Sequence, residues 1–351
     1  RRDSLLPDAV TFTSILKACG STRALTKGKH IHNEMVNKRL LVNDAILVTA
    51  LLDMYAKCGD LEKAQEVFDE LQVRCVVSWS ALIAAYAQQG QCEIALNCFN
   101  HMQRDGHLPN VVTLTSALKA CGGIQDIQKG AEIHDEIVRK REQVHVEIVS
   151  MGFLEKDIVL GTALVDMYAK CGELGKAQEV FDELPLQSVA SWNALIGGYV
   201  HQGQGEDAIN CFEQMQNHGL TPNVITFSCV LKACSNDEAT DKGEQIHDQI
   251  MSEGLMEKHT KVLGDALVCM YAKCGRLMKA QEVLEKLQVK TIVSWNALIT
   301  GYAQQGLSED ALCYFERMEE EGVPPDAITF SLILNVCSSL RAIDEGERVH
   351  H

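Results

Sequence analysis

Cysteine and histidine are the residues of this chain that could hold a metal ion. The sequence contains 14 cysteines and 12 histidines. His-x-Glu is half of the signature of a zinc deaminase, whose other half is a Cys-x-x-Cys pair. The first half occurs at His32/Glu34, His134/Glu136 and His145/Glu147, but Cys-x-x-Cys occurs nowhere. We therefore predict no catalytic residues, no zinc or other metal site, and no cofactor.

The cysteines recur at fixed places and do not form a ligand set. The closest spacings are at Cys229/Cys234 and Cys269/Cys274. Five residues turn about 140° around a helix, so these thiols point apart. Such recurrence is typical of a small packing residue in a reducing compartment. The chain also lacks a glycine-rich phosphate loop and a nucleophile elbow, so we predict no small-molecule substrate.

Three phrases recur in a fixed order along the chain. Ser-Trp-x-Ala-Leu-Ile stands at 78–83, 191–196 and 294–299, Met-Tyr-Ala-Lys-Cys-Gly at 54–59, 167–172 and 270–275, and Leu-Lys-Ala-Cys at 16–19, 118–121 and 231–234. Repetition of this kind is the signature of structural units that stack on their neighbours. The predicted units are 9–44, 45–75, 76–110, 111–157, 158–188, 189–223, 224–260, 261–291, 292–326 and the partial 327–351, after a tail of an earlier unit at 1–8.

Each unit is predicted to be two antiparallel helices. Trp79, Leu82, Ile83 and Tyr86 are spaced as one apolar face of a helix, and both later copies repeat the pattern. Gly90, Gly203 and Gly306 stand where a glycine ends a helix. We find no alternating strand pattern and no apolar run of about eighteen residues that could span a membrane. The sequence predicts an all-α solenoid.

These phrases and unit lengths resemble the pentatricopeptide repeat family, in particular its plant PLS subclass. The 35-residue units resemble the P motif, and the units before them resemble the L and S motifs, so the likeness covers 9–351. We name them P-type, L-type and S-type units. The resemblance implies a right-handed α-solenoid that binds single-stranded RNA in a chloroplast or mitochondrion, with about one base read per repeat.

The resemblance also implies which side chains contact RNA. In the family the fifth and last residues of a unit read the base, and the second residue sandwiches it. In the P-type units the base readers are Ser80 with Asn110, Asn193 with Asn223, and Asn296 with Asp326, and the sandwiching residues are Val77, Ala190 and Val293. By the family's pairing rules these pairs resemble readers of A, of C with U tolerated, and of U.

The other units depart from this pattern and give weaker base candidates. These are Thr13, Asp44, Thr49, Thr115, Asp157, Thr162 and Ser188. Lys57, Lys170 and Lys273 stand where the family contacts phosphate. In this family L motifs often meet a protein editing cofactor, which makes such a protein a second expected partner.

Each assignment has a structural alternative. Serine and asparagine are favoured at helix starts, so capping could explain Asn110 and Asn223. Lys57 and Lys170 follow Asp53 and Asp166 by four residues, a spacing that favours an ion pair on one helix. Lys273 has Cys269 in that place.

The distribution of charge and an eleven-residue insertion give two further predictions. The net charge of −16 is unusual for an RNA binder. The first helices nevertheless carry more lysines than acids, so the acidity is predicted to lie mainly on the second helices. Unit 111–157 repeats His-x-Glu-Ile-Val after eleven residues, which is about three helical turns. We predict a second helix that is lengthened by three turns.

The sequence therefore predicts a non-enzymatic RNA-binding solenoid that guides organellar RNA processing such as C-to-U editing. The alternative is a protein-interaction scaffold whose groove or L-type units bind a polypeptide. We also expect the chain to be a fragment of a longer protein, because its start reads as the tail of an earlier unit.

Overall fold

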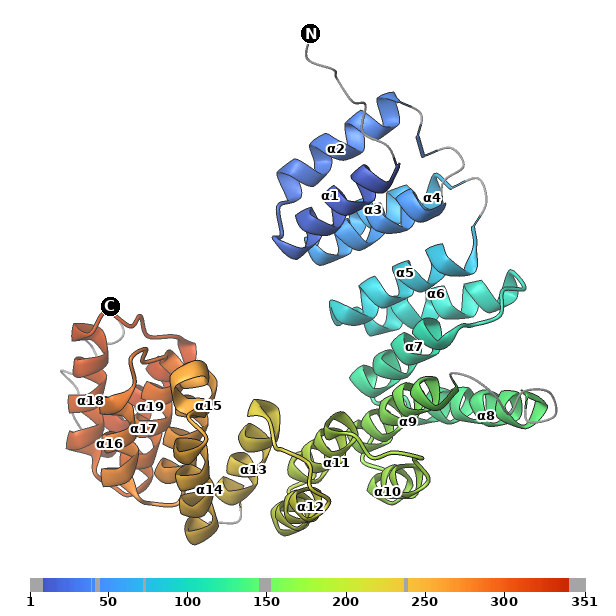
Figure 1. Ribbon diagram of the computed structural model, residues 1–351. Helices are drawn as coiled ribbons and strands as arrows, with labels where there is room; N and C mark the ends of the chain where they lie inside the picture. Colours follow the sequence, from blue (N-terminus) through green and yellow to red (C-terminus); the bar gives the residue numbers. More distant parts are fainter. Residues whose placement is uncertain are drawn as a thin grey trace. The chain divides into compact units, whose positions relative to one another are not determined.

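The computed structural model describes residues 9–38, 40–41, 45–71, 74–144, 153–236 and 239–340. Within these ranges it contains nineteen α-helices and no strand, so the all-α prediction is confirmed. The helices fall into two compact parts, 1–187 and 188–351. The N-terminal part holds α1 to α10, and the C-terminal part holds α11 to α19 (Figure 1).

The helices alternate between the first and the second helix of a unit. The first helices are α1 (Ala9–Ser21), α3 (Ala45–Lys57), α5 (Val76–Gln88), α7 (Val111–Ile124), α9 (Phe153–Lys170), α11 (Val189–His201), α13 (Val224–Asn236), α15 (Leu255–Lys273), α17 (Ile292–Gln304) and α19 (Ala327–Leu340). The second helices are α2 (Leu25–Asn37), α4 (Leu61–Asp69), α6 (Cys92–Arg104), α8 (Ile127–Val144), α10 (Leu174–Asp182), α12 (Gly205–Asn217), α14 (Thr240–Ser252), α16 (Leu277–Lys286) and α18 (Ser308–Glu320).

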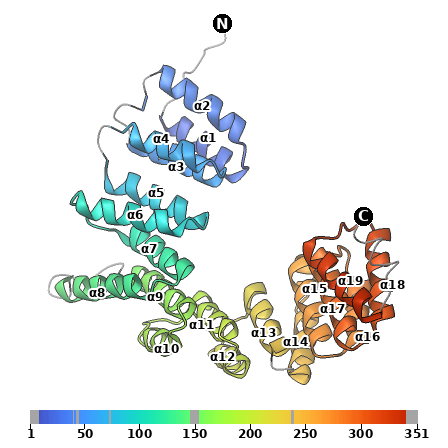
Figure 2. The same cartoon turned by 180° about the vertical axis from the view of Figure 1, so that it is seen from behind.

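In each part the first helices pack in a row. The row runs from α1 through α3, α5 and α7 to α9 in the N-terminal part, and from α11 through α13, α15 and α17 to α19 in the C-terminal part. Each second helix packs against the first helix of its own unit and, within its part, against the next first helix (Figures 1 and 2). This stacking of helical pairs confirms the solenoid, while the handedness of its superhelix stays a prediction.

The apolar faces that the sequence predicted form the core. Trp79, Leu82, Ile83 and Tyr86 of α5 are buried, and Phe99 and Met102 of α6 complete the same layer. Burying such side chains is the main force that holds one unit against the next, because each helical pair alone leaves an apolar face in water.

The turn inside each P-type unit depends on a glycine with positive φ. Gly203 has φ +75°, and the N–H of Gln204 donates to the carbonyl of Tyr199 at 2.9 Å, which closes the end of α11. Gly90 and Gly306 have φ +77° and +75°, so all three predicted helix ends are confirmed. Only glycine adopts this backbone conformation without a steric cost.

Replacing Gly203 with alanine is expected to destabilise the protein by about 1 kcal/mol. The cost arises from the backbone alone, since a Cβ at this place would meet nothing within 4 Å. Urea unfolding measures it. The matched control is Gly197→Ala inside α11, where a Cβ also meets nothing and φ is helical, so alanine should stabilise by about 0.5–1 kcal/mol. Equal effects at the two positions would contradict the assignment.

Two helices begin before the predicted start of their unit. α9 starts at Phe153 and α15 at Leu255, whereas the repeats place those units at 158 and 261. The unit boundaries at 157/158 and 260/261 therefore lie inside helices and do not coincide with turns. α8 has 18 residues where α2 and α14 have 13. The rest of the predicted three-turn extension falls in 145–152, outside the described residues.

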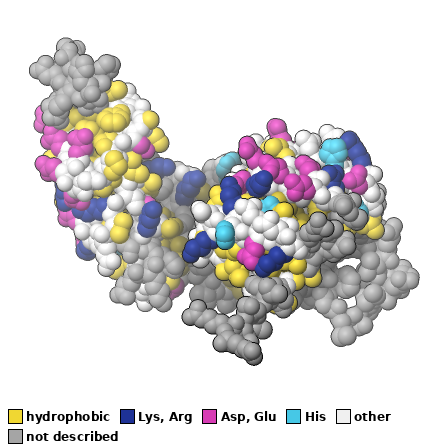
Figure 3. All heavy atoms as spheres, turned by 90° about the horizontal axis from the view of Figure 1, so that it is seen from above, with side chains coloured by type: hydrophobic (Ala, Val, Ile, Leu, Met, Phe, Trp, Pro, Cys, Tyr) yellow, Lys and Arg dark blue, Asp and Glu magenta, His cyan; other side chains and the backbone are white. Residues whose placement is uncertain are grey.

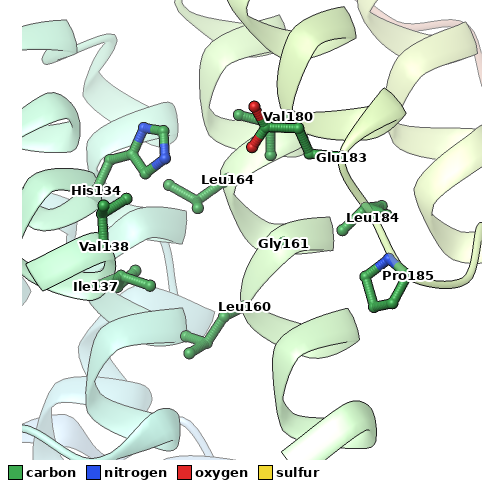
Figure 4. A pocket seen from close by; sticks show the side chains of 10 residues that line it. All are labelled: His134, Ile137, Val138, Leu160, Gly161, Leu164, Val180, Glu183, Leu184 and Pro185. Atoms are coloured by element: carbon green, nitrogen blue, oxygen red, sulfur yellow. The ribbon is translucent and has the colours of Figure 1, made fainter. Parts of the chain in front are cut away.

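A histidine–tyrosine pair joins each L-type unit to the following S-type unit. The Nδ1 atoms of His32, His134 and His247 lie 2.8, 2.9 and 2.9 Å from the hydroxyls of Tyr55, Tyr168 and Tyr271, respectively. A small pocket of about 40 Å³ beside His134 is lined mainly by apolar side chains of α8 and α9 and by the segment that follows α10 (Figure 4). The histidines that the His-x-Glu motif singled out at 32 and 134 therefore join helices together.

Acidification is expected to weaken these junctions. Burial lowers the pKa of both His32 and His247 below 6.5; Lys63 lowers that of His32 further, and Glu70 and Glu66 oppose it. Between the folded pKa and about 6.5 the unfolded chain binds more protons, so the free energy of unfolding falls as the pH falls through this window. The urea concentration at the midpoint of unfolding should change less between about pH 7.5 and pH 5.5 in His247→Gln than in the unmodified protein. A variant of the exposed His201, His201→Gln, should keep the full difference. The interpretation fails if both variants behave alike.

Candidate nucleic-acid interface

The structure brings together the two predicted base readers of every P-type unit. Asn193 donates through Nδ2 to Oδ1 of Asn223 at 3.2 Å, and Asn296 donates in the same way to Oδ1 of Asp326 at 3.3 Å. The Oγ of Ser80 lies 3.3 Å from Oδ1 of Asn110. Each pair joins a first helix to the start of the next one, 30 residues later in the sequence.

The last residue of each pair also caps the next helix. Oδ1 of Asn110, Asn223 and Asp326 accepts the main-chain N–H three residues later at 2.9, 3.0 and 2.8 Å, respectively. The hydrogen bond from the N–H of Thr329 lowers the pKa of Asp326, so its carboxyl group is ionised at neutral pH. The hydrogen bonds of helix capping are thus confirmed for Asn110 and Asn223. Capping is compatible with base reading, because it holds the last residue of each unit beside the fifth residue with which it forms a pair.

A buried threonine that the sequence patterns did not indicate contacts each reading pair. Thr113, Thr226 and Thr329 are the third residues of the units that follow, and all three are 0% exposed. Their Oγ1 atoms lie 2.9 Å from Oγ of Ser80, 2.6 Å from Oδ1 of Asn193 and 2.7 Å from Oδ1 of Asn296, respectively. The available signal was threonine at the third place of each unit that follows a P-type unit.

The second residue of every unit carries an apolar or small side chain in solvent. Val77, Ala190 and Val293 are exposed, as their predicted role in stacking requires. The same holds in the L-type and S-type units, for which no sandwiching residue was predicted. Their second residues are Val10, Ile46, Val112, Val159, Ile225, Val262 and Ile328, with 49% to 73% of each side chain exposed. Within each part, exposed apolar groups on the first helices suit flat, partly apolar ligands such as bases.

A pocket of about 250 Å³ surrounds the reading pair of the third P-type unit. Asn296 and Asp326 line it together with Val293 and Ile328, which are the second residues of two successive units. Lys273 lines the same pocket. Its walls thus offer apolar surface, a polar edge and one cation, the groups that a base and its phosphate would each contact.

The third S-type unit pairs its fifth and last residues, Asp265 and Thr291, in the same manner, although neither was a predicted base candidate. Thr291 donates through Oγ1 to Oδ1 of Asp265 at 2.6 Å, and burial raises the pKa of Asp265. Ser188 caps α11 by accepting the N–H of Ser191 at 3.2 Å. Thr162 and Thr49 lie on the first helices α9 and α3.

The L-type candidates are not held as reading pairs by the described contacts. Thr13 and Thr115 donate to the carbonyls of Ala9 and Val111 in their own helices, at 2.8 and 2.7 Å. Asp44 and the side chain of Asp157 lie outside the described residues, although Asp157 itself belongs to α9. Ser80 of the first P-type unit makes the same kind of contact, to the carbonyl of Val76 at 2.6 Å.

Two of the three predicted phosphate-binding lysines have carboxylate partners. Lys57 lies 2.7 Å from Asp53, and Lys170 lies 2.6 Å from Asp166. No ion pair is found for Lys273 among the described residues. The ion-pair alternative is therefore confirmed for the first two lysines. On the face drawn in Figure 3, basic side chains lie among acidic ones and gather into no single basic patch of described residues.

The part of the chain that the structure describes shows no cluster of three or more His, Cys, Asp or Glu side chains that could hold a metal ion. The cysteines there are all unpaired by disulfides, and nearly all are buried or half-buried. Among these residues, none of the helices is both long and apolar enough to cross a membrane.

Comparison with known proteins identifies the family. The PPR repeat family model matches residues 74–123, 187–236 and 290–339, and a PPR repeat model matches 10–40, 46–76, 162–187 and 265–292. The chain belongs to the pentatricopeptide repeat family. These matches confirm the resemblance that the repeated phrases indicated, although they do not single out the PLS subclass.

The relatives of this pentatricopeptide repeat chain include organellar plant proteins. It is 37% identical to a chloroplastic pentatricopeptide repeat-containing protein of Arabidopsis thaliana, with 97% of this chain and 53% of the relative covered. It is 34% identical to a mitochondrial one from the same plant, with 98% and 47% covered. The chain thus spans about half the length of these relatives.

A solved structure supports the repeat fold over nearly the whole chain. The crystal structure of the pentatricopeptide repeat protein PPR10 in complex with an 18-nt psaJ RNA element aligns with a TM-score of 0.70. The alignment covers 99% of this chain and 55% of that one at 17% identity, so the similarity concerns the fold.

Proposed function

We propose that this pentatricopeptide repeat chain binds single-stranded RNA and reads one base at each P-type unit. The observation that carries the proposal is the pocket of the third P-type unit. Asn296 and Asp326 offer donors and acceptors there, between the exposed apolar side chains of Val293 and Ile328. A base that enters between two such side chains would stack on them and present its edge to the polar pair.

The pairing rules of the family give the proposed register. Ser80 with Asn110 would read A, Asn193 with Asn223 would read C or U, and Asn296 with Asp326 would read U, in 5′ to 3′ order. Two less specified nucleotides would lie between successive readers, because a P-type unit is every third unit. The family resemblance implies that the L-type units read more weakly than the P-type units.

Affinity should depend more on bases than on phosphates. Lys57 and Lys170 are engaged with Asp53 and Asp166, and the whole chain carries a net charge of −16. Neutralisation of phosphate by lysine or arginine is what makes nucleic-acid binding strong and salt-dependent. Lys273 supports a single phosphate contact, since it lines the pocket of the third reading pair.

The biological role that we propose is guidance of organellar RNA processing such as C-to-U editing, in a chloroplast or mitochondrion. The chloroplastic and mitochondrial relatives support this placement. The described units would supply recognition of the RNA, with a protein editing cofactor as a further partner at the L-type units.

Selection from a random RNA pool tests the function. Incubation of the chain with a fluorescently labelled pool, followed by sequencing of the bound fraction, should enrich A, then C or U, then U, each separated by two variable positions. A pool that remains unenriched at saturating protein would contradict RNA reading and favour a protein-interaction scaffold.

A further inference from the structure

A buried threonine lies beneath the reading pair of every P-type unit. It belongs to the following unit, so it is not one of the residues that face a base. We propose that Thr113, Thr226 and Thr329 are positioning residues that orient the reading pair and thereby set which bases it accepts. The inference rests on the base-reading function proposed above.

The geometry of the second P-type unit shows how the orientation would be set. The N–H of Asn223 donates to Oγ1 of Thr226 at 3.1 Å. The hydroxyl of Thr226 then donates to Oδ1 of Asn193 at 2.6 Å, its shorter contact, while Oδ1 of Asn223 lies at 3.1 Å. Nδ2 of Asn193 donates to Oδ1 of Asn223 at 3.2 Å. The three hydrogen bonds from Asn223 to Thr226, from Thr226 to Asn193 and from Asn193 back to Asn223 form a closed ring.

The ring decides which atom of the asparagine is free. With Oδ1 of Asn193 held by the buried hydroxyl, the amide oxygen is occupied on the protein side. One N–H of Nδ2 is used by Asn223, and the remaining N–H is left for a ligand. The pair therefore presents a donor from its fifth residue, and a flipped amide would present an acceptor.

The third P-type unit repeats this arrangement with an acid in place of the second amide. The N–H of Asp326 donates to Oγ1 of Thr329 at 3.1 Å, and that hydroxyl reaches Oδ1 of Asn296 at 2.7 Å. In the first unit, the hydroxyl of Ser80 is 2.9 Å from Thr113 and donates to the carbonyl of Val76 at 2.6 Å. The serine therefore contacts the threonine at the same position of the next unit, although it offers a hydroxyl where the other two units offer an amide.

Removal of the hydroxyl without a change of shape isolates its effect. Thr226→Val replaces the hydroxyl by a methyl group, and the main-chain N–H of residue 226 can still cap onto Oδ1 of Asn223. Oδ1 of the half-buried Asn193 then loses its donor, so the amide is no longer held in one orientation and can turn toward water or ligand. Both faces of the amide become available to a base.

The experiment uses the full chain and four RNAs that carry the sequence enriched from the random pool and differ only at the base opposite the second P-type unit. Titration should show that the affinity ratio between the best and the worst base shrinks at least about tenfold in Thr226→Val. Thr226→Ser keeps the hydroxyl and should keep the ratio. Preference at the bases opposite the first and third P-type units should be unchanged in both variants.

The outcomes separate this inference from the function on which it rests. If Thr226→Val weakens binding to all four RNAs by the same factor, the threonine has only a structural role and the inference is overturned. If the unmodified protein already ranks the four RNAs equally, base reading at this unit is wrong and the inference falls with it. A loss of ranking in Thr226→Ser as well would also overturn it, since the hydroxyl is retained there.

Discussion

Asn296→Thr is expected to move the preferred base opposite the third P-type unit from U to G. In the unmodified protein Oδ1 of Asp326 receives an N–H from Asn296 at 3.3 Å. Threonine lacks that amide, so the carboxylate is left to accept from the base, and guanine presents adjacent N–H donors on its edge. The change of preferred base should correspond to about 1–3 kcal/mol, as in other base-reading interfaces. Titration of both proteins against RNAs that differ only at this base measures it.

The neighbouring readers provide the control. Asn193 with Asn223 belongs to another unit and should keep its preference for C or U in the variant. Circular dichroism should be unchanged, because residue 296 lies within α17 and threonine is accepted in a helix at a small cost. Identical ranking of the four bases by the two proteins would show that Asn296 does not read RNA.

Trp295→Ala is expected to be among the most destabilising single changes in the C-terminal part, at about 3–5 kcal/mol. The side chain is 0% exposed, and Lys290 lies 5.5 Å from its ring centroid. Its removal would leave a cavity between helices that the stacked units cannot close without moving apart. Urea unfolding followed by circular dichroism measures the loss.

Trp295→Phe separates packing from hydrogen bonding. Nε1 of Trp295 is buried and has no hydrogen-bond partner among the described residues, so phenylalanine removes no polar contact. We expect it to cost only about 1–2 kcal/mol, from lost volume. If phenylalanine proves as harmful as alanine, the indole N–H has a role that packing does not explain.

The helical pairs could be predicted because their signals are local. The spacing of Trp79, Leu82 and Ile83 defines a buried face without reference to any other unit. The glycine at 203 likewise ends its helix through its own backbone conformation. The repetition of the units then predicted that they stack in chain order, because each unit has to cover the apolar face of its neighbour.

The helix starts of α9 and α15 could not be read from the repeats. Alignment of units marks the place of the reading residues, whereas a helix begins wherever its first turn can be closed. In α15 that place is Leu255, just after Gly254 with φ +65°. The boundary at 260/261 therefore describes a register along the chain and not a turn.

The contacts of the site depended on spacing across units. Asn193 and Thr226 lie 33 residues apart, and no periodicity within one helix connects them. The sequence left Lys57 and Lys170 with two possible roles, and the structure shows that each lies against its aspartate. Lys273 differs because Cys269 replaces the acid.

The sharing of each reading pair with the following helix limits how such arrays can be recombined. A crossover between residues 223 and 224 keeps Asn193 and Asn223 together but imports a foreign residue in the place of Thr226. The hydroxyl of Thr226 is 2.6 Å from Oδ1 of Asn193. Such a graft would therefore transfer the reading pair without the threonine that orients it. An exchangeable segment should therefore extend through the third residue of the next unit. Natural recombination at that boundary would preserve the base preference of the transferred unit.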